Sequence, residues 1–292
     1  MSAPELIRIA TPHLSAAINP LGAELTHLHD ADGRELMTNA DPAFWAGHAP
    51  LLFPVVGRLN GDVLHVDGTA YPMKQHGFAR RSLFKLVEHD ATRAVFLLED
   101  NAETRAAYPF AFALRVTYTI TDATLAISVE IENRNNTSLP ASFGFHPAFA
   151  WPLPYGLPRS EHRIVFAADE PDALRELAGN AIIEQRRPSP LDGRTLALDD
   201  ALFERDALIW DSVRSRSVRY GAPTGPQLRV DFPDMPMLGI WTKPGAAFIC
   251  IEPWHGIADP AGFAGDIREK PGIVEIAPGA TLACAMQVTL EG

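Results

Sequence analysis

The most regular feature of the chain is strict alternation of apolar and polar residues, which is typical of strands with one buried face. Alternation runs through residues 114–120, breaks at Thr121-Asp122-Ala123, and resumes through 125–131. A short break between two alternating runs predicts an antiparallel hairpin. Two further hairpins are predicted in the same way, one turning at Asp67-Gly68 and one turning at Pro278-Gly279 between residues 272–276 and 281–290.

Helical signals are few: one turn through Trp45 and two turns over Pro171–Ala178. Because strands do not alternate with helices, a parallel sheet is disfavoured, and we predict an antiparallel all-β fold with two large sheets packed face to face. We expect one domain over residues 1–292, with 151–158 and 185–190 as long loops. Further strands are predicted at 83–99, 163–168, 194–198, 207–210, 216–220, 227–232, 237–242 and 246–251.

Composition narrows the class of protein. Hydrophobic residues make up 47% and charged residues 21% of the chain, as in ordinary globular proteins. The net charge of −11 disfavours nucleic acid and anionic membranes as partners. The N-terminus has no signal-peptide pattern, and Cys250 and Cys284 lie in apolar runs typical of buried free thiols. We therefore expect a cytoplasmic protein, a monomer or homodimer, without disulfides.

Common chemical motifs are missing, including a glycine-rich phosphate loop, GxSxG, HExxH, CxxC and an EF-hand loop. Four polar residues inside apolar or turn-like segments are left as candidates. Arg58 follows an apolar approach and Gly57, so it either faces a cleft or extends into water from a strand end. His76 lies in a turn beside basic neighbours, where it either binds a ligand or is simply solvated.

His146 stands among three phenylalanines and precedes a proline, and Glu252 ends an apolar strand beside Trp254. Burial would lower the pKa of the imidazole and raise that of the carboxyl, which suits groups that take up and release protons. The alternatives are a core histidine bonded to a carbonyl group and a glutamate in a salt bridge. Together the candidates form an acid/base pair with donors for an oxygen-rich neutral ligand. Tryptophans at 45, 151, 241 and 254 either stack on that ligand or pack the core.

Four strings in order, FPVVGRLNGD, KQHGFAR, FGFHPAF and FICIEPWHGIADP, resemble the aldose 1-epimerase (galactose mutarotase) family, in particular its shorter bacterial branch with an HGFAR signature. The resemblance covers nearly the whole chain and implies a large β-supersandwich whose concave face binds a hexose. It implies His146 as general acid and Glu252 as general base. It also implies substrate contacts for Arg58 and His76, with Trp241 and Lys243 lining the pocket.

One string of the family is missing. Galactose mutarotases carry a sugar-contacting aspartate in an Asp-His motif followed by an aromatic residue, and no such string occurs here. Asp206 is the nearest candidate by order along the chain. Contacts to the far side of a sugar ring select the epimer, so the preferred sugar stays open.

The resemblance implies mutarotation, in which the hemiacetal opens to the aldehyde and recloses. We expect Glu252 to take the anomeric hydroxyl proton while protonated His146 donates to the ring oxygen, from opposite sides of the ring and without a metal or organic cofactor. One alternative is a sugar-binding module without turnover. Another is a mutarotase for hexose 6-phosphates, suggested by the basic cluster Lys74, Arg80 and Arg81. A glycoside hydrolase is less favoured because only one carboxylate is well placed.

Overall fold

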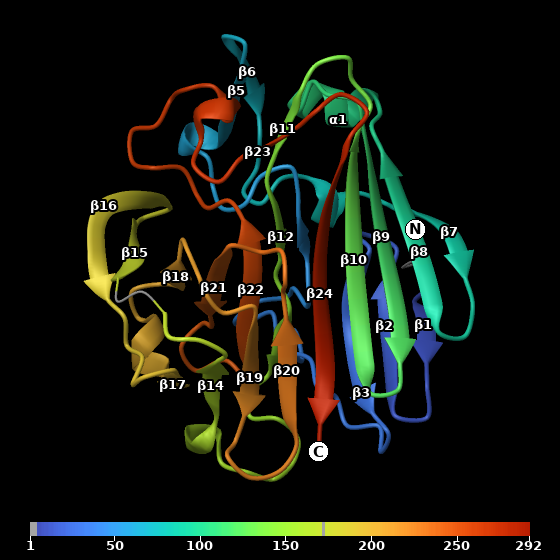
Figure 1. Ribbon diagram of the computed structural model, residues 1–292, viewed down its shortest axis with the longest axis vertical. Helices are drawn as coiled ribbons and strands as arrows, with labels where there is room; N and C mark the ends of the chain where they lie inside the picture. The colour runs from blue at the N-terminus through green and yellow to red at the C-terminus, as the bar shows by residue number, and fades with distance from the viewer. Residues whose placement is uncertain (1–4, 171–172) are drawn as a thin grey trace.

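The computed structural model describes residues 5–170 and 173–292 and consists mainly of strands (Figure 1). Their bounds are β1 Ile7–Ala10, β2 Leu14–Asn19, β3 Glu24–Asp30, β4 Leu51–Leu52, β5 Val63–Val66, β6 Thr69–Pro72, β7 Lys85–His89, β8 Arg93–Glu99, β9 Phe112–Thr121, β10 Thr124–Asn133, β11 Leu139–Ala141, β12 Phe143–Phe145, β13 Ala148–Ala150, β14 Arg163–Phe166, β15 Ala173–Ala178, β16 Ala181–Pro188, β17 Thr195–Ala197, β18 Leu208–Trp210, β19 Ser217–Gly221, β20 Gln227–Asp231, β21 Met237–Trp241, β22 Phe248–His255, β23 Val274–Ile276 and β24 Thr281–Glu291. The helical elements are α1 Ala102–Ala107 and five 3-10 turns, at Asn60–Asp62, Ala79–Arg81, Arg159–Glu161, Asp200–Phe203 and Ile267–Glu269.

Two large sheets organise these strands, and the pairings within both are antiparallel, as predicted. The nine-stranded sheet has the order β17-β14-β19-β20-β24-β10-β9-β8-β7, and its long strands β8, β9, β10 and β24 stand side by side in Figure 1. The eight-stranded sheet has the order β16-β15-β18-β21-β22-β12-β4, with β13 also paired to β22. Smaller sheets are formed by β1-β2-β3, β5-β6 and β11-β23.

The hairpin predicted from the alternation at 114–131 is confirmed as β9 and β10. Val116 pairs with Val129 and Leu114 with Ile131, all four fully buried. The same hydrophobic core cluster includes Ile251 of β22, so both large sheets contribute to one core. Each such aliphatic side chain contributes about 1.5–3 kcal/mol by leaving water, so this shared core stabilises the packing of the two sheets.

Several local predictions differ from the structure. Residues 173–178 form strand β15 rather than a helix, while residues 171–172 of that prediction lie outside the described part of the chain. The predicted single turn through Trp45, in contrast, is present: the Trp45 amide donates to the Asp41 carbonyl at 2.9 Å, and the Asp41 side chain caps the turn. The α1 helix was not predicted, although Asn101 and Thr104 form a capping box at its start.

The turn at Pro278-Gly279 does not join a hairpin, because β23 pairs with β11 while β24 pairs with β10 and β20. The predicted loop at 185–190 is also partly wrong, since residues 185–188 belong to β16. The hairpin at Asp67-Gly68 and the long loop at 151–158 are confirmed.

Cys250 and Cys284 are buried free thiols. Within the described ranges, no helix is both long and apolar enough to cross a membrane. The extent of the domain, residues 1–292, stays a prediction.

Candidate active site

Strand β22 carries the carboxylate of the site in the middle of the eight-stranded sheet. Glu252 and Trp254 point to the same face because side chains alternate along a strand. Their neighbours across the sheet are glycines: Gly239 of β21 pairs with Glu252, and Gly144 of β12 pairs with Trp254. A Cβ at Gly239 would lie 2.3 Å from the Trp254 ring, and one at Gly144 would lie 2.6 Å from it. The indole therefore lies directly over the backbones of both flanking strands.

His146 comes directly after β12, the strand next to β22, and its side chain lies beside Glu252. Its Nε2 lies 3.2 Å from Glu252 Oε2, and both side chains are more than nine-tenths buried. The Trp45 ring stacks on the imidazole at 4.9 Å, and the Trp241 ring meets it edge-on at 6.1 Å. The two candidate proton carriers thus share one wall. The expectation that they face each other across a bound ring is wrong for this structure.

Burial shifts the pKa values of His146 and Glu252 in opposite directions. It lowers the pKa of His146 to about 3, with a smaller contribution in the same direction from Arg80. It raises the pKa of Glu252 well above its usual value, and the Asp206 carboxylate adds to this while the Trp254 side chain opposes it. These shifts favour a pair that holds one proton, because His146 stays neutral while Glu252 keeps its proton to a higher pH than usual. Burial favours the form in which that proton is on the Glu252 carboxyl, 3.2 Å from the unprotonated His146 Nε2.

His76 is held by a reciprocal pair of backbone contacts with Gly57. The His76 amide donates to the Gly57 carbonyl at 2.8 Å, and the Gly57 amide donates to His76 Nδ1 at 3.1 Å. His76 adopts a φ of +64°, which is uncommon for a residue with a Cβ. Burial and the neighbouring His146, Arg80 and Arg81 hold the pKa of His76 well below its usual value. A neutral ring whose Nδ1 accepts a hydrogen bond carries its proton on Nε2, and this nitrogen lies 3.2 Å from the side-chain amide of Gln75.

The His146–Glu252 pair and His76 line one cavity of about 340 Å³, at the lower end of the size range for small-molecule sites. Of the other predicted site residues, Arg58, Asp206 and Trp241 also line it. Lys243 does not: its ammonium donates to the Ala43 carbonyl, and the residue lines an adjacent, shallower depression. The remaining lining residues are Trp45, Val56, Gly57, Gln75, Arg80, Leu177, Gly179, Asn180, Ala207, Ile209, Trp254 and Ala258.

The two arginines of the cavity differ in their partners. Arg58 is engaged with Asp62 through two hydrogen bonds of 2.8 Å, so a ligand would have to share its guanidinium. Arg80 is half-buried, and no carboxylate of the described residues lies within ion-pair distance of it. Burial and the neighbouring Arg81 lower the pKa of Arg80 to about 10, so it stays charged at neutral pH. Arg80 is therefore the cation with free hydrogen-bonding capacity toward a ligand.

Sequence reasoning named Arg80 only as part of a basic cluster and did not name Gln75 or Asn180. The 3-10 turn at Ala79–Arg81 places Arg80 at the cavity, while Lys74 and Arg81 do not line it. A signal was available in the string KQHGFAR, where the cation follows the histidine by four residues. Trp151, in contrast, is fully buried in the main core and donates to the Arg159 carbonyl, so its predicted alternative role in packing is the one observed.

One cluster at the cavity wall has metal-ligand chemistry: His146 and Glu252, which line the cavity, and Cys250, which does not, have donor atoms within 4.8 Å of one another. Burial and the Glu252 carboxylate raise the pKa of the Cys250 thiol well above its usual value. Metal ligation requires a thiolate, so this cluster fits a metal ion poorly. The donor set suits proton transfer better.

Comparisons with known proteins agree with this geometry. The family model described as aldose 1-epimerase matches residues 5–269. Protein LacX of Lactococcus lactis subsp. lactis is 31% identical over 97% of this chain and 99% of its own length. A galactose mutarotase related enzyme from Lactobacillus acidophilus has a TM-score of 0.92 at 31% identity, covering 99% of this chain and 98% of its own.

A galactose mutarotase-like protein from Lactobacillus casei has a TM-score of 0.91 at 30% identity, over 98% of this chain and all of its own. The match of the family model spans most of the chain, and these relatives are aligned over nearly their full lengths. The resemblance noted in the four sequence strings is thereby confirmed, as is the galactose mutarotase-like fold. The chain belongs to the aldose 1-epimerase family.

Proposed function

We propose that this protein is an isomerase, an aldose 1-epimerase that interconverts the α and β anomers of a hexose. The observation that carries the proposal is the His146–Glu252 contact of 3.2 Å at the wall of a cavity of small-molecule size. The anomeric hydroxyl oxygen and the ring oxygen of a pyranose are bonded to the same carbon. Two proton carriers in contact with each other can therefore reach both oxygens from one side.

The proton balance of ring opening fits a pair that holds one proton. One member takes the proton of the anomeric hydroxyl, the other gives its proton to the ring oxygen, and the bond between that oxygen and the anomeric carbon breaks to leave the aldehyde. Reclosure after rotation reverses both transfers. With Glu252 as base, the shared proton starts on His146; with the roles exchanged, it starts on Glu252. Both forms have the same proton count and interconvert across the 3.2 Å contact.

Neighbouring groups supply orientation and charge stabilisation. The Arg80 guanidinium is a donor toward sugar oxygens, and the His76 ring is fixed before a ligand binds, because the Gly57 amide holds its Nδ1 and the Gln75 side-chain amide lies 3.2 Å from its Nε2. The buried Trp254 indole N–H forms no hydrogen bond of standard geometry among residues 5–170 and 173–292, and it favours the charged form of the neighbouring Glu252 carboxyl. The faces of Trp45 and Trp254 suit the apolar side of a pyranose.

The test is anomeric equilibration of α-glucose and α-galactose, followed by polarimetry and NMR saturation transfer. The wild-type protein should exceed the buffer rate, and Glu252→Gln and His146→Ala should each lower kcat by about 10²–10⁴-fold. Glu184→Gln, an exposed carboxylate outside the cavity, is the matched control and should retain the wild-type rate. Wild-type rates in both cavity variants would refute the assignment. Sugar binding without acceleration would indicate a binding module.

The hexose 6-phosphate alternative loses part of its support in the structure. It rested on Lys74, Arg80 and Arg81, and of these only Arg80 lines the cavity. Competition by glucose 6-phosphate against glucose, measured at low and high salt, separates the two substrates. A preference for the phosphate that weakens with salt would favour the alternative.

A further inference from the structure

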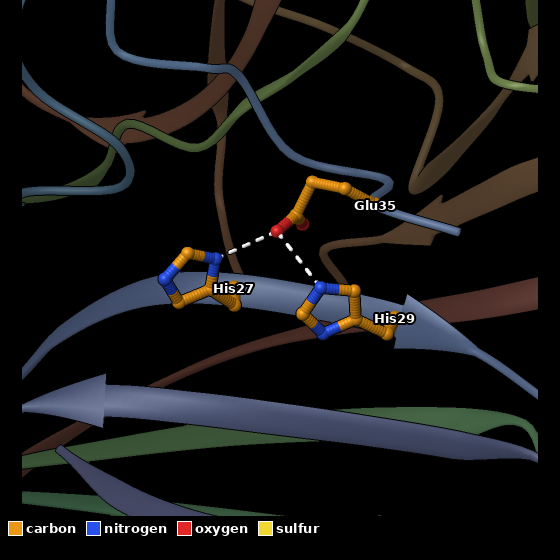
Figure 2. Close-up of side chains that lie close together, drawn as sticks. All are labelled: His27, His29 and Glu35. Atoms are coloured by element: carbon orange, nitrogen blue, oxygen red, sulfur yellow. Dashed lines mark hydrogen bonds and ion pairs between the residues drawn. The ribbon is translucent and has the colours of Figure 1, made fainter. Parts of the chain in front are cut away.

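Outside the cavity, a second cluster of ionisable side chains lies where β3 meets the segment that follows it (Figure 2). Glu35 Oε2 is 2.7 Å from His27 Nδ1 and 3.2 Å from His29 Nε2. The three side chains are 39%, 29% and 30% exposed for His27, His29 and Glu35, so a dissolved ion can reach them. None of the three lines the active-site cavity.

The fold prepares this arrangement through backbone contacts. His27 and His29 are two residues apart on β3 and so project from the same face, with their rings stacked at 5.6 Å and 13°. Glu35 is held opposite His29 by an isolated β-bridge. Its Oε1 accepts from the amides of Leu28 and Met37, both at 3.0 Å, which leaves Oε2 facing the two imidazoles.

We propose that His27, His29 and Glu35 bind a divalent transition-metal ion of the Zn²⁺ class. Two imidazoles and one carboxylate are a recurrent ligand set for such ions, whereas Mg²⁺ and Ca²⁺ prefer oxygen ligands alone. One donor atom from each residue already lies within 4.8 Å of the others. Bonds of about 2.0–2.2 Å in tetrahedral geometry place donors about 3.3–3.5 Å apart, so small side-chain rotations suffice.

The backbone amides that fix Glu35 Oε1 act as the outer shell of this site, because they orient the carboxylate before a metal arrives. Three protein ligands leave a fourth position of the ion for water or an exogenous ligand. Bound metal would tie residues 35–37 to β3. Met37 pairs with Phe149 of β13, so the tied segment continues directly into the sheet that carries the active site.

The experiment is calorimetric titration of Zn²⁺ into untagged, chelator-treated full-length protein near pH 7.5, with Mg²⁺ as the control ion. We expect one Zn²⁺ per chain and no binding of Mg²⁺. His27→Gln, His29→Gln and Glu35→Gln should each weaken Zn²⁺ binding at least tenfold. His13→Gln, an exposed histidine outside the cluster, should not. Binding should weaken on acidification, because protons compete for the imidazole nitrogens.

Thermal unfolding gives a second readout on the same variants. Saturating Zn²⁺ should raise the Tm of the wild type and of His146→Ala, but not that of the His27→Gln/His29→Gln double variant, since a ligand stabilises only the form that binds it. Circular dichroism checks that each variant is folded, and Glu35→Gln tests the site if a histidine variant is not. No Zn²⁺ binding by the wild type, equal affinity in the cluster variants, or loss of binding only in His146→Ala would overturn the proposal.

Discussion

The Trp254 indole, which lies over the backbones of β21 and β12, forms the floor of the cavity. Replacing Gly239 by alanine tests how this indole packs against β21. The added Cβ would lie 2.3, 2.5 and 2.9 Å from three atoms of the six-membered ring of Trp254, whereas ordinary contacts begin near 3.4 Å. The indole must therefore shift by about 1 Å. Gly239 has no positive φ, so the clash is the whole perturbation and backbone strain adds nothing.

The indole cannot move away from Gly239 toward β12. There the ring already lies against Gly144, where even a Cβ would come within 2.6 Å of it. The ring can relax only toward the cavity that it lines, next to Glu252. We expect a loss of about 1–3 kcal/mol in the free energy of unfolding from overpacking. We also expect kcat/KM to fall by about 10–100-fold, because a displacement near 1 Å disturbs substrate placement.

A double-mutant cycle with Trp254→Phe supplies the control, because phenylalanine lacks the outer ring atoms that Gly239→Ala would strike. Chemical denaturation should show that the double variant loses at least about 1 kcal/mol less than the two single losses together. Polarimetric kinetics on the same four proteins should show whether activity follows the same coupling. Additive losses of stability, or a Gly239→Ala protein indistinguishable from wild type, would refute this description of the floor.

Three further predictions concern protonation, binding and buried charge. The mutarotation rate should fall near pH 3, where His146 becomes protonated while Glu252 keeps its proton, and fall again above the raised pKa of Glu252. A bell-shaped profile whose acid limb lies near pH 6.5, the usual pKa of histidine, would contradict this. His76→Asn, which tolerates the positive φ, should lower kcat/KM by about 10²-fold while leaving the Tm near that of wild type, as measured by kinetics and thermal unfolding. Lys270→Met should cost about 3–5 kcal/mol in urea denaturation, because it leaves the buried Asp259 carboxylate without its cation at 3.2 Å; an unchanged midpoint would show that the pair is dispensable.

The fold could be predicted from the chain where strand periodicity is strong and local. The alternation at 114–131 required a hairpin in this register, since a slip of one residue would expose its apolar face. Residues 173–178, Ala-Leu-Arg-Glu-Leu-Ala, are strong helix formers, yet they pair with β16 and β18. Long-range pairing overrides propensity there. The turn at 278–279 could be recognised from its residues. The strands that pair with β23 and β24 on either side of it could not, because turn residues carry no information about strands far away in the sequence.

For the site, the sequence indicated which groups burial would perturb but not their mutual geometry. His146 and Glu252 are more than a hundred residues apart, and their contact depends on β12 and β22 being neighbours in one sheet. Arg80 could not be separated from Lys74 and Arg81 without the 3-10 turn that selects it. Nothing in the local sequence showed that Gly144 and Gly239 flank Trp254, since their requirement for glycine comes from a side chain on another strand.

For the proposed ring opening, the contact between His146 and Glu252 makes their opposite pKa shifts useful. By itself, a buried carboxyl with a raised pKa, such as Glu252, is a poor base, because it stays protonated. A buried imidazole with a lowered pKa, such as His146, is a poor acid, because it stays neutral. In contact, they hold one proton that either atom can carry, and burial penalises a second proton as well as the loss of the first. The proposed ring opening adds one proton to the pair and removes one, so each turnover leaves the count unchanged. A pair as buried as this one can therefore run the reaction without exchanging protons with solvent in each turnover.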